Sequence, residues 1–594
     1  MCGLYGFIGI SSPKSDAWKA GSQIHRGPDS CSREIFDWGV MGHQALWIRE
    51  YISPELQPIR IDNYSITFNG ELYPLNAEGE KTNLSEIEII QNTVKALGVK
   101  GLSSLSGMYS IVVYDHEAHR LYFIRDKSGQ KPLFIRFKNL LPGINCAWSS
   151  ELESLREISL TWECNTKLIN RSISMSNFVV YGSDSTINDI ESVKPGSILT
   201  VELGNFEKTN ETLGNINCNM PKFSKGGGPL QTALFDDLFS NVVSAYLTCF
   251  GNPALLLSGG VDSTLIFASS LKSNREIAPY TMMYKDCPDE FNWDGLRAIQ
   301  ISEYLGKRTK VIEFSKRDYL SCFLRSLEYL DFPVGNISIP SYLYISEQLG
   351  YLGLGHRVVL SGSGGDETFS GYPRYVDFIR HKNYVRRIAL KLINRSEVDE
   401  FYLERALDSS LRSLSRDEIK DVRKILRGNS REKEALKQLL HLDRDNWLIN
   451  DSFQVLDRFG MRNQIEYRAP FMDYLVQEFS DKLTEGQLIQ GVHSKVILQE
   501  VLRPNVPSWF LPTLKKKGWK SPINYWLQTD DKFKRSLNSI ILELIPTRNE
   551  GEIQWADFRN QTETIIASGQ ITKQVASLVS SAVISRRISS PETP

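Results

Sequence analysis

The stretch Leu255 to Thr264, LLLSGGVDST, joins residues typical of a buried strand to residues that can bind a phosphate. Glycines and hydroxyls begin abruptly where a strand of leucines would end. Adjacent glycines let backbone N–H groups approach a polyphosphate, and the N-terminus of a following helix adds partial positive charge. A carboxylate at this place is best explained as a Mg²⁺ ligand, which makes Asp262 the candidate. The alternative is a purely structural role, as an ordinary strand-to-helix turn.

A second loop of this kind follows another apolar strand. Residues Val358 to Tyr372 read VVLSGSGGDETFSGY, so small residues and the carboxylate of Asp366 stand where a strand ends. Parallel strands meet their ligands at their carboxyl ends, so we expect the two loops to face each other. Alternating strand and helix patterns predict the parallel α/β sheet that this requires, at Tyr280 to Tyr284, Ala298 to Leu305 and Lys310 to Phe314.

Cys2 is a candidate nucleophile because it directly follows the initiator methionine. Removal of that methionine would place the thiol beside a free α-amine, whose ordinary pKa of about 7.7–8.0 suits a general base. The other seven cysteines are scattered without CxxC pairs, so neither a disulfide framework nor a zinc site is indicated.

Composition excludes several classes of protein. The 594 residues are enough for two or more domains, and 69 basic against 70 acidic residues leave a formal charge of −1, which argues against a nucleic-acid partner. No apolar run approaches the length of a membrane span, and the start lacks a basic leader. We expect a cytoplasmic protein without a membrane partner. The oligomeric state stays open, with a homodimer as one possibility.

Several motifs together resemble the glutamine-dependent asparagine synthetase family. They are CGLYGFIG from Cys2, FNGELY from Phe68, LSGMYSIVVYD from Leu105, RDKSGQKPLF from Arg125 and SSELESL from Ser149, in that order. The resemblance implies an α/β and α+β fold class. Its first part would be a four-layer αββα N-terminal-nucleophile glutaminase domain, of class II. Its second part would be an α/β parallel-sheet PP-loop ATP pyrophosphatase domain.

The resemblance also implies roles for residues near Cys2. Asn69 and Gly70 would form the oxyanion hole, and Glu71 would hold the polar end of glutamine. The alternative for Asn-Gly is a hairpin turn, and we expect the strand from Phe68 to Tyr73 to be broken at this pair.

Two departures from the family pattern affect glutamine binding. Ala45 stands where the family has an arginine for the α-carboxylate, and Glu86 replaces the aspartate that binds the α-ammonium. Arg49 lies four residues farther along a predicted strand from Gly42 to Ile48 and could compensate, although a strand would place it about 13 Å away. We expect intact thiol chemistry with weakened or reorganised glutamine binding.

In the second part, SGGVDS resembles the PP-loop of ATP pyrophosphatases. The resemblance implies ATP at Leu257, Ser258, Gly259, Gly260, Asp262, Ser263, Ser361 and Gly362, and Mg²⁺ at Asp262 and Asp366. Lys495, in HSKVIL, would contact the phosphates. Ser363 replaces a family glutamate, and Phe332 and Asn336 stand in LDFPVGNISIP where acids are common. These changes support an acceptor pocket less polar than one for aspartate.

The predicted boundaries are a glutaminase domain at 2–204, a linker at 205–230, a synthetase-like domain at 231–530 and an extension at 531–594. Residues 376–440 are interpreted as exposed helices, Glu466, Arg468 and Asp473 as structural pairs, and Lys516 to Leu527 as a closing motif. The end from Ile588 is expected to be disordered.

The leading hypothesis is an ATP-dependent ligase that takes ammonia from glutamine and forms an amide on an AMP-activated carboxylate, by default aspartate. One alternative is the same chemistry on another carboxylate, such as a uronic acid of a surface polysaccharide or a secondary-metabolite acid. A second is intramolecular amide formation, as in β-lactam synthetases or lasso-peptide cyclases, which commonly lack a working Cys2. The third is a catalytically silent scaffold.

Overall fold

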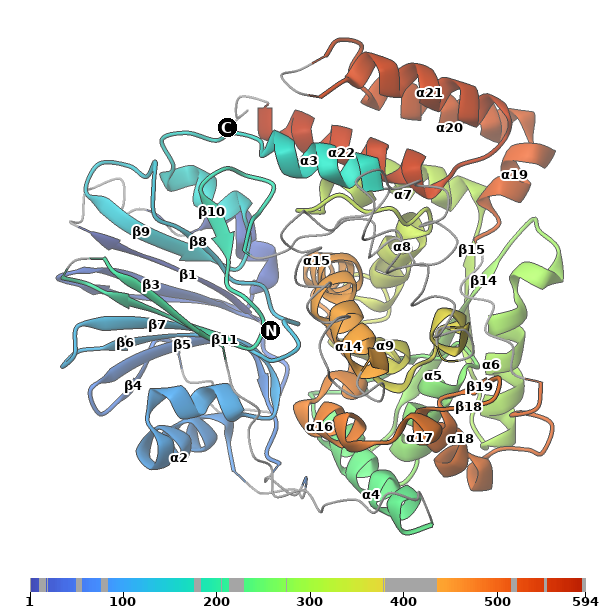
Figure 1. Ribbon diagram of the computed structural model, residues 1–594, viewed down its shortest axis with the longest axis horizontal. Coiled ribbons are helices and arrows are strands. Elements are labelled where there is room, and N and C mark those ends of the chain that lie inside the picture. Colours follow the sequence, from blue (N-terminus) through green and yellow to red (C-terminus); the bar gives the residue numbers. More distant parts are fainter. Residues whose placement is uncertain are drawn as a thin grey trace.

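The computed structural model forms a sheet-rich N-terminal half and a C-terminal half of helices around a parallel sheet (Figure 1). It describes residues 2–9, 18, 20–49, 56–75, 79, 84–175, 183–204, 206–212, 229–273, 275–377, 379, 435–513, 521–549 and 553–589. Most of the predicted linker and most of the predicted helices at 376–440 lie outside these residues, as does the part of the predicted closing motif at 516–520.

Two six-stranded antiparallel sheets make up the N-terminal half. The first has the order β10-β8-β9-β1-β3-β2, with bounds Ile190–Ser192, Phe134–Arg136, Ile144–Ser149, Cys2–Gly9, Gly39–Ala45 and Ser30–Phe36. The second has the order β12-β11-β7-β6-β5-β4, with bounds Lys208–Thr212, Ser197–Glu202, Arg120–Arg125, Gly107–Asp115, Tyr64–Leu72 and Ile59–Ile61.

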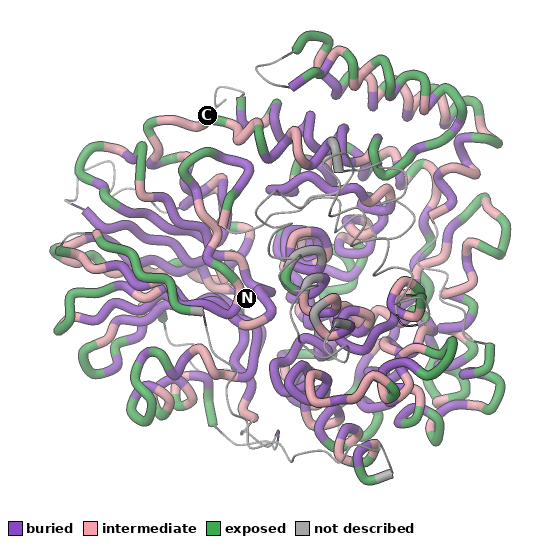
Figure 2. Tube along the Cα trace, viewed as in Figure 1, coloured by how far each residue is buried: buried purple, intermediate pink, exposed green. Residues whose placement is uncertain are grey.

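The two sheets pack face to face through alternating apolar side chains. Leu4, Met41, Val112, Phe123 and Trp148 belong to one buried cluster between them. Helix α2, Glu86–Leu97, covers the outer face of the second sheet, and helix α3, Thr166–Met175, packs into the apolar cluster on the outer face of the first. The inner strands are therefore mostly buried, whereas the edge strands β2 and β12 are partly or largely exposed (Figure 2).

Two strands differ from the sequence predictions. Strand β3 ends at Ala45, so the predicted strand from Gly42 to Ile48 is too long. Strand β5 runs unbroken through Asn69 and Gly70, which pair with residues of β6, so the predicted break is wrong. Gly70 has φ 134°, and a Cβ there would lie 1.9 Å from the Met108 carbonyl oxygen, so close strand approach rather than a turn requires this glycine.

The C-terminal half is built on a five-stranded parallel sheet, as predicted. Its order is β15-β14-β13-β16-β17, with bounds Lys310–Phe314, Ala278–Tyr284, Ala254–Leu256, Val358–Leu360 and Glu466–Arg468. Strands β13 and β16 are neighbours at its centre, which brings the loops that follow them together.

Helices surround this sheet. They are α4 Pro229–Tyr246, α5 Val261–Ser270, α6 Trp293–Tyr304, α7 Lys316–Glu328, α8 Ile339–Leu349, α9 Gly365–Phe369, α14 Ala435–Leu442, α15 Gln454–Arg462, α16 Tyr474–Lys482, α17 Glu485–Leu488, α18 Val496–Leu502, α19 Ile523–Thr529, α20 Asp531–Leu544, α21 Trp555–Ala567 and α22 Lys573–Ser589. A π-helical segment, Asp443–Phe453, joins α14 to α15. Ile588, where disorder is predicted to begin, is buried within α22.

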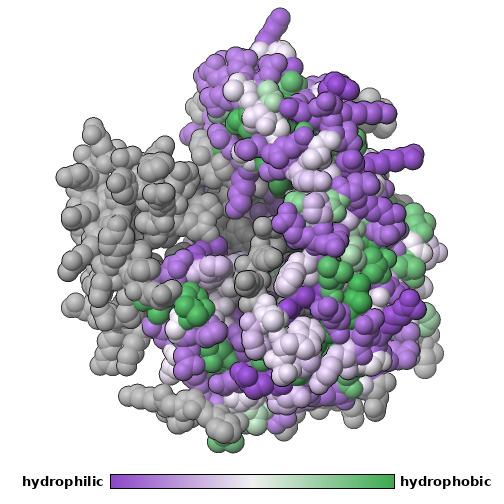
Figure 3. Space-filling view, turned by 90° about the vertical axis from the view of Figure 1, so that its right-hand side faces the viewer, coloured by the Kyte–Doolittle hydropathy of each residue, from purple (hydrophilic) through white to green (hydrophobic). Residues whose placement is uncertain are grey.

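The face of this half that Figure 3 shows is mostly hydrophilic, with a few hydrophobic groups between. Within the described part of the chain, no helix combines the length and the apolar character that crossing a membrane requires.

Candidate active sites

Cys2 and Asn69 lie side by side, on β1 of the first N-terminal sheet and on β5 of the second. The backbone nitrogen of Cys2 donates to Asn69 Oδ1 at 3.0 Å, which leaves Asn69 Nδ2 as a donor toward Ser150 Oγ at 3.5 Å. Burial raises the pKa of the Cys2 thiol. Strands β1 and β5 thus bring together the predicted nucleophile and the predicted oxyanion donors, including Gly70 next in the chain.

Arg49 lies beside the predicted glutamine-binding carboxylates, which contradicts the separation expected along a strand. Its Nε donates to Glu71 Oε2 at 2.6 Å, and its Nη2 donates to the Leu72 carbonyl at 2.8 Å and lies 3.7 Å from Glu86 Oε1. The expectation failed because β3 ends at Ala45, opposite Cys2, and the chain then turns toward β5.

Arg468 links this group of residues around Glu71 to the C-terminal half. Its Nη2 lies 3.4 Å from Glu71 Oε2, and its Nε donates to Glu466 Oε1 at 2.5 Å, the predicted structural pair. Its backbone carbonyl accepts from the nitrogen of Ser361, in the second predicted ATP loop, at 2.9 Å. The predicted partnership of Asp473 with these residues is wrong, because Asp473 accepts instead from Ser106, Leu475 and Tyr246.

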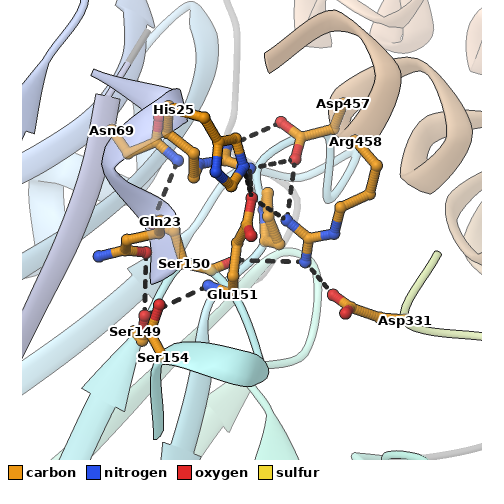
Figure 4. A network of polar contacts seen from close by, with 12 residues as sticks. Gln23, His25, Asn69, Ser149, Ser150, Glu151, Ser154, Asp331, Asp457 and Arg458 are labelled. Carbon is orange, nitrogen blue, oxygen red and sulfur yellow. Dashed lines mark hydrogen bonds and ion pairs between the residues drawn. The ribbon is translucent and has the colours of Figure 1, made fainter. Parts of the chain in front are cut away.

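A buried network of ion pairs fills the boundary between the halves (Figure 4). Arg26 donates to both carboxylate oxygens of Asp457, at 2.6 and 3.0 Å, and to the backbone carbonyl of Cys2 at 3.2 Å. Arg458 pairs with Glu151 at 2.9 Å and with Asp331. Although burial opposes its ionisation, His25 and the two arginines lower the pKa of Glu151 well below its ordinary value.

The first predicted ATP loop joins a strand to a helix, as the sequence predicts. It runs from the end of β13 into the N-terminus of α5, and Ser258 donates from its backbone nitrogen to Ser263 Oγ at 3.1 Å. Gly259 has φ 68°, and a Cβ there would lie 2.6 Å from the Cβ of Arg297. The turn can therefore lie against α6 only with glycine at this position. Leu257 is buried beneath it, and Gly260 directly precedes the helix.

The second loop packs directly on the first. A Cβ added at Gly362 would lie 3.1 Å from the Asp262 Cβ, and a Cβ added at Gly365 would lie 2.7 Å from Asp262 Oδ1. Because these glycines have no side chains, the aspartate can reach the second loop. Ser363, in the place of the family glutamate, lies with its Oγ 2.8 Å from Ser361 Oγ. The small residues of this loop thus form a cradle around the carboxylate.

Lys495 joins the two predicted metal ligands. Its Nζ donates to Asp262 and lies 2.5 Å from Asp366 Oδ1. Although burial favours the neutral amine, these carboxylates raise the pKa of Lys495 above its ordinary value, so it is charged. An added Cβ at Gly371 would lie 1.8 Å from Asp366 Oδ1 and 2.2 Å from Lys495 Cε. Two carboxylates and a glycine cradle form a donor set that fits Mg²⁺.

A cavity of about 390 Å³ lies between the halves, lined by residues of both. Phe332 lines it with its ring 6.0 Å from that of Phe134, and Met472 borders it next to Gly364 of the second loop. Gln130 is buried at its wall, and among the described residues its Nε2 has no hydrogen-bond partner. The cavity wall therefore combines apolar side chains such as Phe332 with polar and charged ones, and Gln130 offers a donor.

Sequence reasoning missed the residues that join the two centres. Arg26 lies in HRGPD, and Asp457 and Arg458 lie upstream of the predicted structural pairs Glu466, Arg468 and Asp473. Both arginines are buried, and such charges are rarely buried without partners, but their burial depends on the fold and leaves no local pattern in the sequence.

Comparison with known proteins gives two family matches. The asparagine synthase model matches residues 234–578, and the glutamine amidotransferase domain model matches residues 1–211. The chain is 25% identical to a putative glutamine-hydrolysing asparagine synthetase of Mycobacterium tuberculosis, over 89% of each chain. It is 22% identical to asparagine synthetase 1 of Bacillus subtilis, over 89% of this chain and 88% of the relative. The asparagine synthetase of Rattus norvegicus is 26% identical over 63% of this chain and 67% of its own.

Proposed function

The chain belongs to the asparagine synthase family and carries an N-terminal glutamine amidotransferase domain, and on that premise we propose a two-centre mechanism. Glutamine is hydrolysed at Cys2, and the ammonia aminates an AMP-activated carboxylate at the loops around Asp262 and Asp366. The observation that carries the proposal is the convergence of Lys495 on both aspartates from a third segment of the chain.

At the first centre, the thiol of Cys2 attacks the side-chain carbonyl of glutamine. Its proton passes through the α-amine that removal of Met1 would free, and the amide nitrogen leaves as ammonia. Asn69 Nδ2 and the Gly70 N–H donate to the oxyanion, and loss of one such donor typically costs about 10²–10³ in rate. Water then releases glutamate from the thioester.

Arg49 takes the role of the family arginine, whose position is occupied by Ala45 in this chain. Its guanidinium lies within reach of Glu71 and Glu86, so one pocket contains a fork for the α-carboxylate and two acids for the α-ammonium. Arg468 neutralises part of the charge on Glu71 from the other half.

At the second centre, the backbone and hydroxyls of Ser258, Gly259, Gly260 and Ser263 bind the pyrophosphate part of ATP, and Ser361 and Gly362 lie against the adenylate. Asp262 and Asp366 would hold Mg²⁺, which when bound supplies positive charge to the leaving pyrophosphate. Lys495 adds a second positive charge there, on the phosphates. The acceptor carboxylate attacks the α-phosphorus, pyrophosphate leaves, and ammonia then displaces AMP to form the amide.

Aspartate is the default acceptor, which would make the product asparagine. A second candidate, another and less polar carboxylate, is favoured by one observation: Phe332, where the family often has an acid, lines the cavity between the halves. Ser363 points the same way, since its hydroxyl contacts Ser361 and presents no carboxylate to an acceptor ammonium.

The experiment is to measure AMP, pyrophosphate and amide product from Mg·ATP and glutamine, with and without aspartate. Aspartate-dependent AMP with an equal amount of asparagine would support asparagine synthesis. Glutaminase activity without aspartate-dependent AMP would reject aspartate and leave the second candidate. Absence of both glutaminase and AMP formation with any carboxylate would reject the two-centre proposal.

A further inference from the structure

Helix α22, Lys573–Ser589, lies in the interior although none of the functional motifs belongs to it. It packs beside α3 of the N-terminal half and against α7 of the C-terminal half (Figure 1). One buried face of the helix is rich in serine: Ser577, Ser580, Ser581 and Ser585 are all at most 3% exposed. A buried hydroxyl costs free energy unless it is hydrogen-bonded, so the partners of these serines matter for the stability of the segments around α22.

Ser580 binds both backbone groups of one residue in the loop Leu330 to Ser338, here called the acceptor loop. Its Oγ accepts from the Val334 nitrogen at 3.0 Å, and its one proton can go to the Val334 carbonyl oxygen at 3.1 Å or to the Ser577 carbonyl oxygen of α22 at 3.0 Å. This loop has no strand or helix of its own before α8, so its buried backbone needs such partners. A single side-chain hydroxyl therefore fixes the middle of the loop.

The same helix holds both flanks of the loop. Arg587 Nη2 lies 3.7 Å from Asp331 Oδ1, and Arg587 also donates to the Glu328 carbonyl. Val575 and Val579 line a small apolar space of about 20 Å³ together with Val334, Ile337 and Ile339. The loop is thus packed on α22 along its length.

The loop carries two residues that stand where the family often has acids. Phe332 lines the cavity between the halves, and Asn336 lines the small apolar space beside α22. Phe332 is held on the other side, where its carbonyl accepts from Gln454 at 3.4 Å and its ring meets Phe134. A shift of Val334 would therefore move Phe332, its neighbour but one, within the cavity.

We propose that α22 is the supporting wall of the acceptor site and that Ser580 is a positioning residue for the acceptor, acting through Val334. The inference rests on the proposed function, since it takes the loop to contact the acceptor carboxylate. Ser580 touches no reacting atom. Its loss affects acceptor binding and leaves ATP and glutamine binding unchanged.

The test compares S580A with S581A in the full-length enzyme. Ser581 is a matched control, because it is the adjacent buried serine and its Oγ has no hydrogen-bond partner among the residues described. With Mg·ATP, glutamine and aspartate, S580A should raise the KM for aspartate about tenfold, as expected for a lost buried hydrogen-bond pair. The KM for ATP and the glutaminase rate should stay within twofold of wild type, and S581A should match wild type throughout. Equal changes in all three constants, or in both variants, would overturn the proposal.

Hydrogen–deuterium exchange separates failure of this inference from failure of the proposed function. It needs no turnover, so it applies even when aspartate proves not to be the acceptor. Peptides covering 330–338 should exchange at least fivefold faster in S580A than in wild type, while peptides covering 255–270 stay unchanged. Unchanged exchange in the acceptor loop of S580A would reject the positioning role whatever the acceptor is.

Discussion

Arg49 Nε lies 2.6 Å from Glu71 Oε2. It lies at the predicted glutamine site, where the family arginine is replaced by Ala45. The guanidinium thus reaches the pocket from a turn that follows β3 rather than from the strand itself. An arginine on a turn can bind the same carboxylate with a different approach, because the planar fork rather than the position of the backbone sets the geometry.

Replacing Arg49 should impair glutamine use and spare ammonia use. For R49A we expect the KM for glutamine to rise about 10- to 100-fold, as for a lost charged hydrogen bond, while amide formation from ammonium stays near wild type. R49K is the matched control: it keeps the charge without the fork and should fall between the two. Equal losses with glutamine and with ammonium would show that Arg49 supports the fold instead.

Cys2 should be needed only for the glutamine-driven reaction. We expect C2A to lose product formation from glutamine, since alanine has no thiol to attack the amide, and to keep its ammonium-driven rate and its ATP use. Product measured by amino-acid analysis with each nitrogen source decides this. Glutamine-driven product equal to wild type would remove the nucleophile assignment.

Lys495 should be needed for ATP chemistry and not for glutamine hydrolysis. K495M removes the charge that lies between Asp262 and Asp366, and we expect AMP formation to fall about 10²–10³-fold, as for other electrostatic transition-state contacts. K495R keeps the charge and should retain more activity. The readout is AMP at saturating Mg·ATP beside the glutaminase rate. A K495M enzyme with normal AMP formation would contradict the assignment.

His43 should make the N-terminal half sensitive to acid. Burial lowers the pKa of His43 to about 3, and the ordinary value is 6.5. Below pH 6.5 the unfolded chain therefore binds a proton that the folded one excludes, so stability is lost as the pH falls from 6.5 toward 3. Between pH 7 and pH 5 this residue alone should remove about 2 kcal/mol of unfolding free energy.

Urea unfolding at pH 7, 6 and 5 tests that prediction. H43N, which keeps a side-chain donor but cannot titrate, should lose less stability over this range than wild type. His493 is exposed, so H493N should follow the wild-type slope. If H43N and wild type lose stability in parallel, protonation of His43 is not the cause.

The parallel sheet and its two loops could be predicted because their signals are local. An apolar strand followed by glycines and hydroxyls indicates both the element and its end, and β15 has the predicted bounds, Lys310–Phe314. The meeting of Asp262 with Asp366 follows from the shared carboxyl edge of parallel strands.

Arg49 and Arg26 could not be placed because distant residues decide their positions. Two hydrogen bonds hold the turn after Ala45. The Trp47 nitrogen donates to Asp29 Oδ2 at 2.8 Å, and the Phe250 nitrogen donates to the Ile48 carbonyl. The continuity of β5 through Asn69 and Gly70 likewise depends on pairing with β6, which no local pattern announces.

The pair of Arg26 with Asp457 has a consequence for the order of folding. The two residues are 431 positions apart, and closing so long a separation requires both halves to be largely formed first. Until they meet, Arg26 has Glu151 of its own half and Asp457 has Arg458, but both lack their bidentate pair on a surface that will be buried, which opposes partial docking. The halves should therefore fold separately and then join in one late, cooperative step, so that a chain with only one folded half has no preassembled route between its two centres.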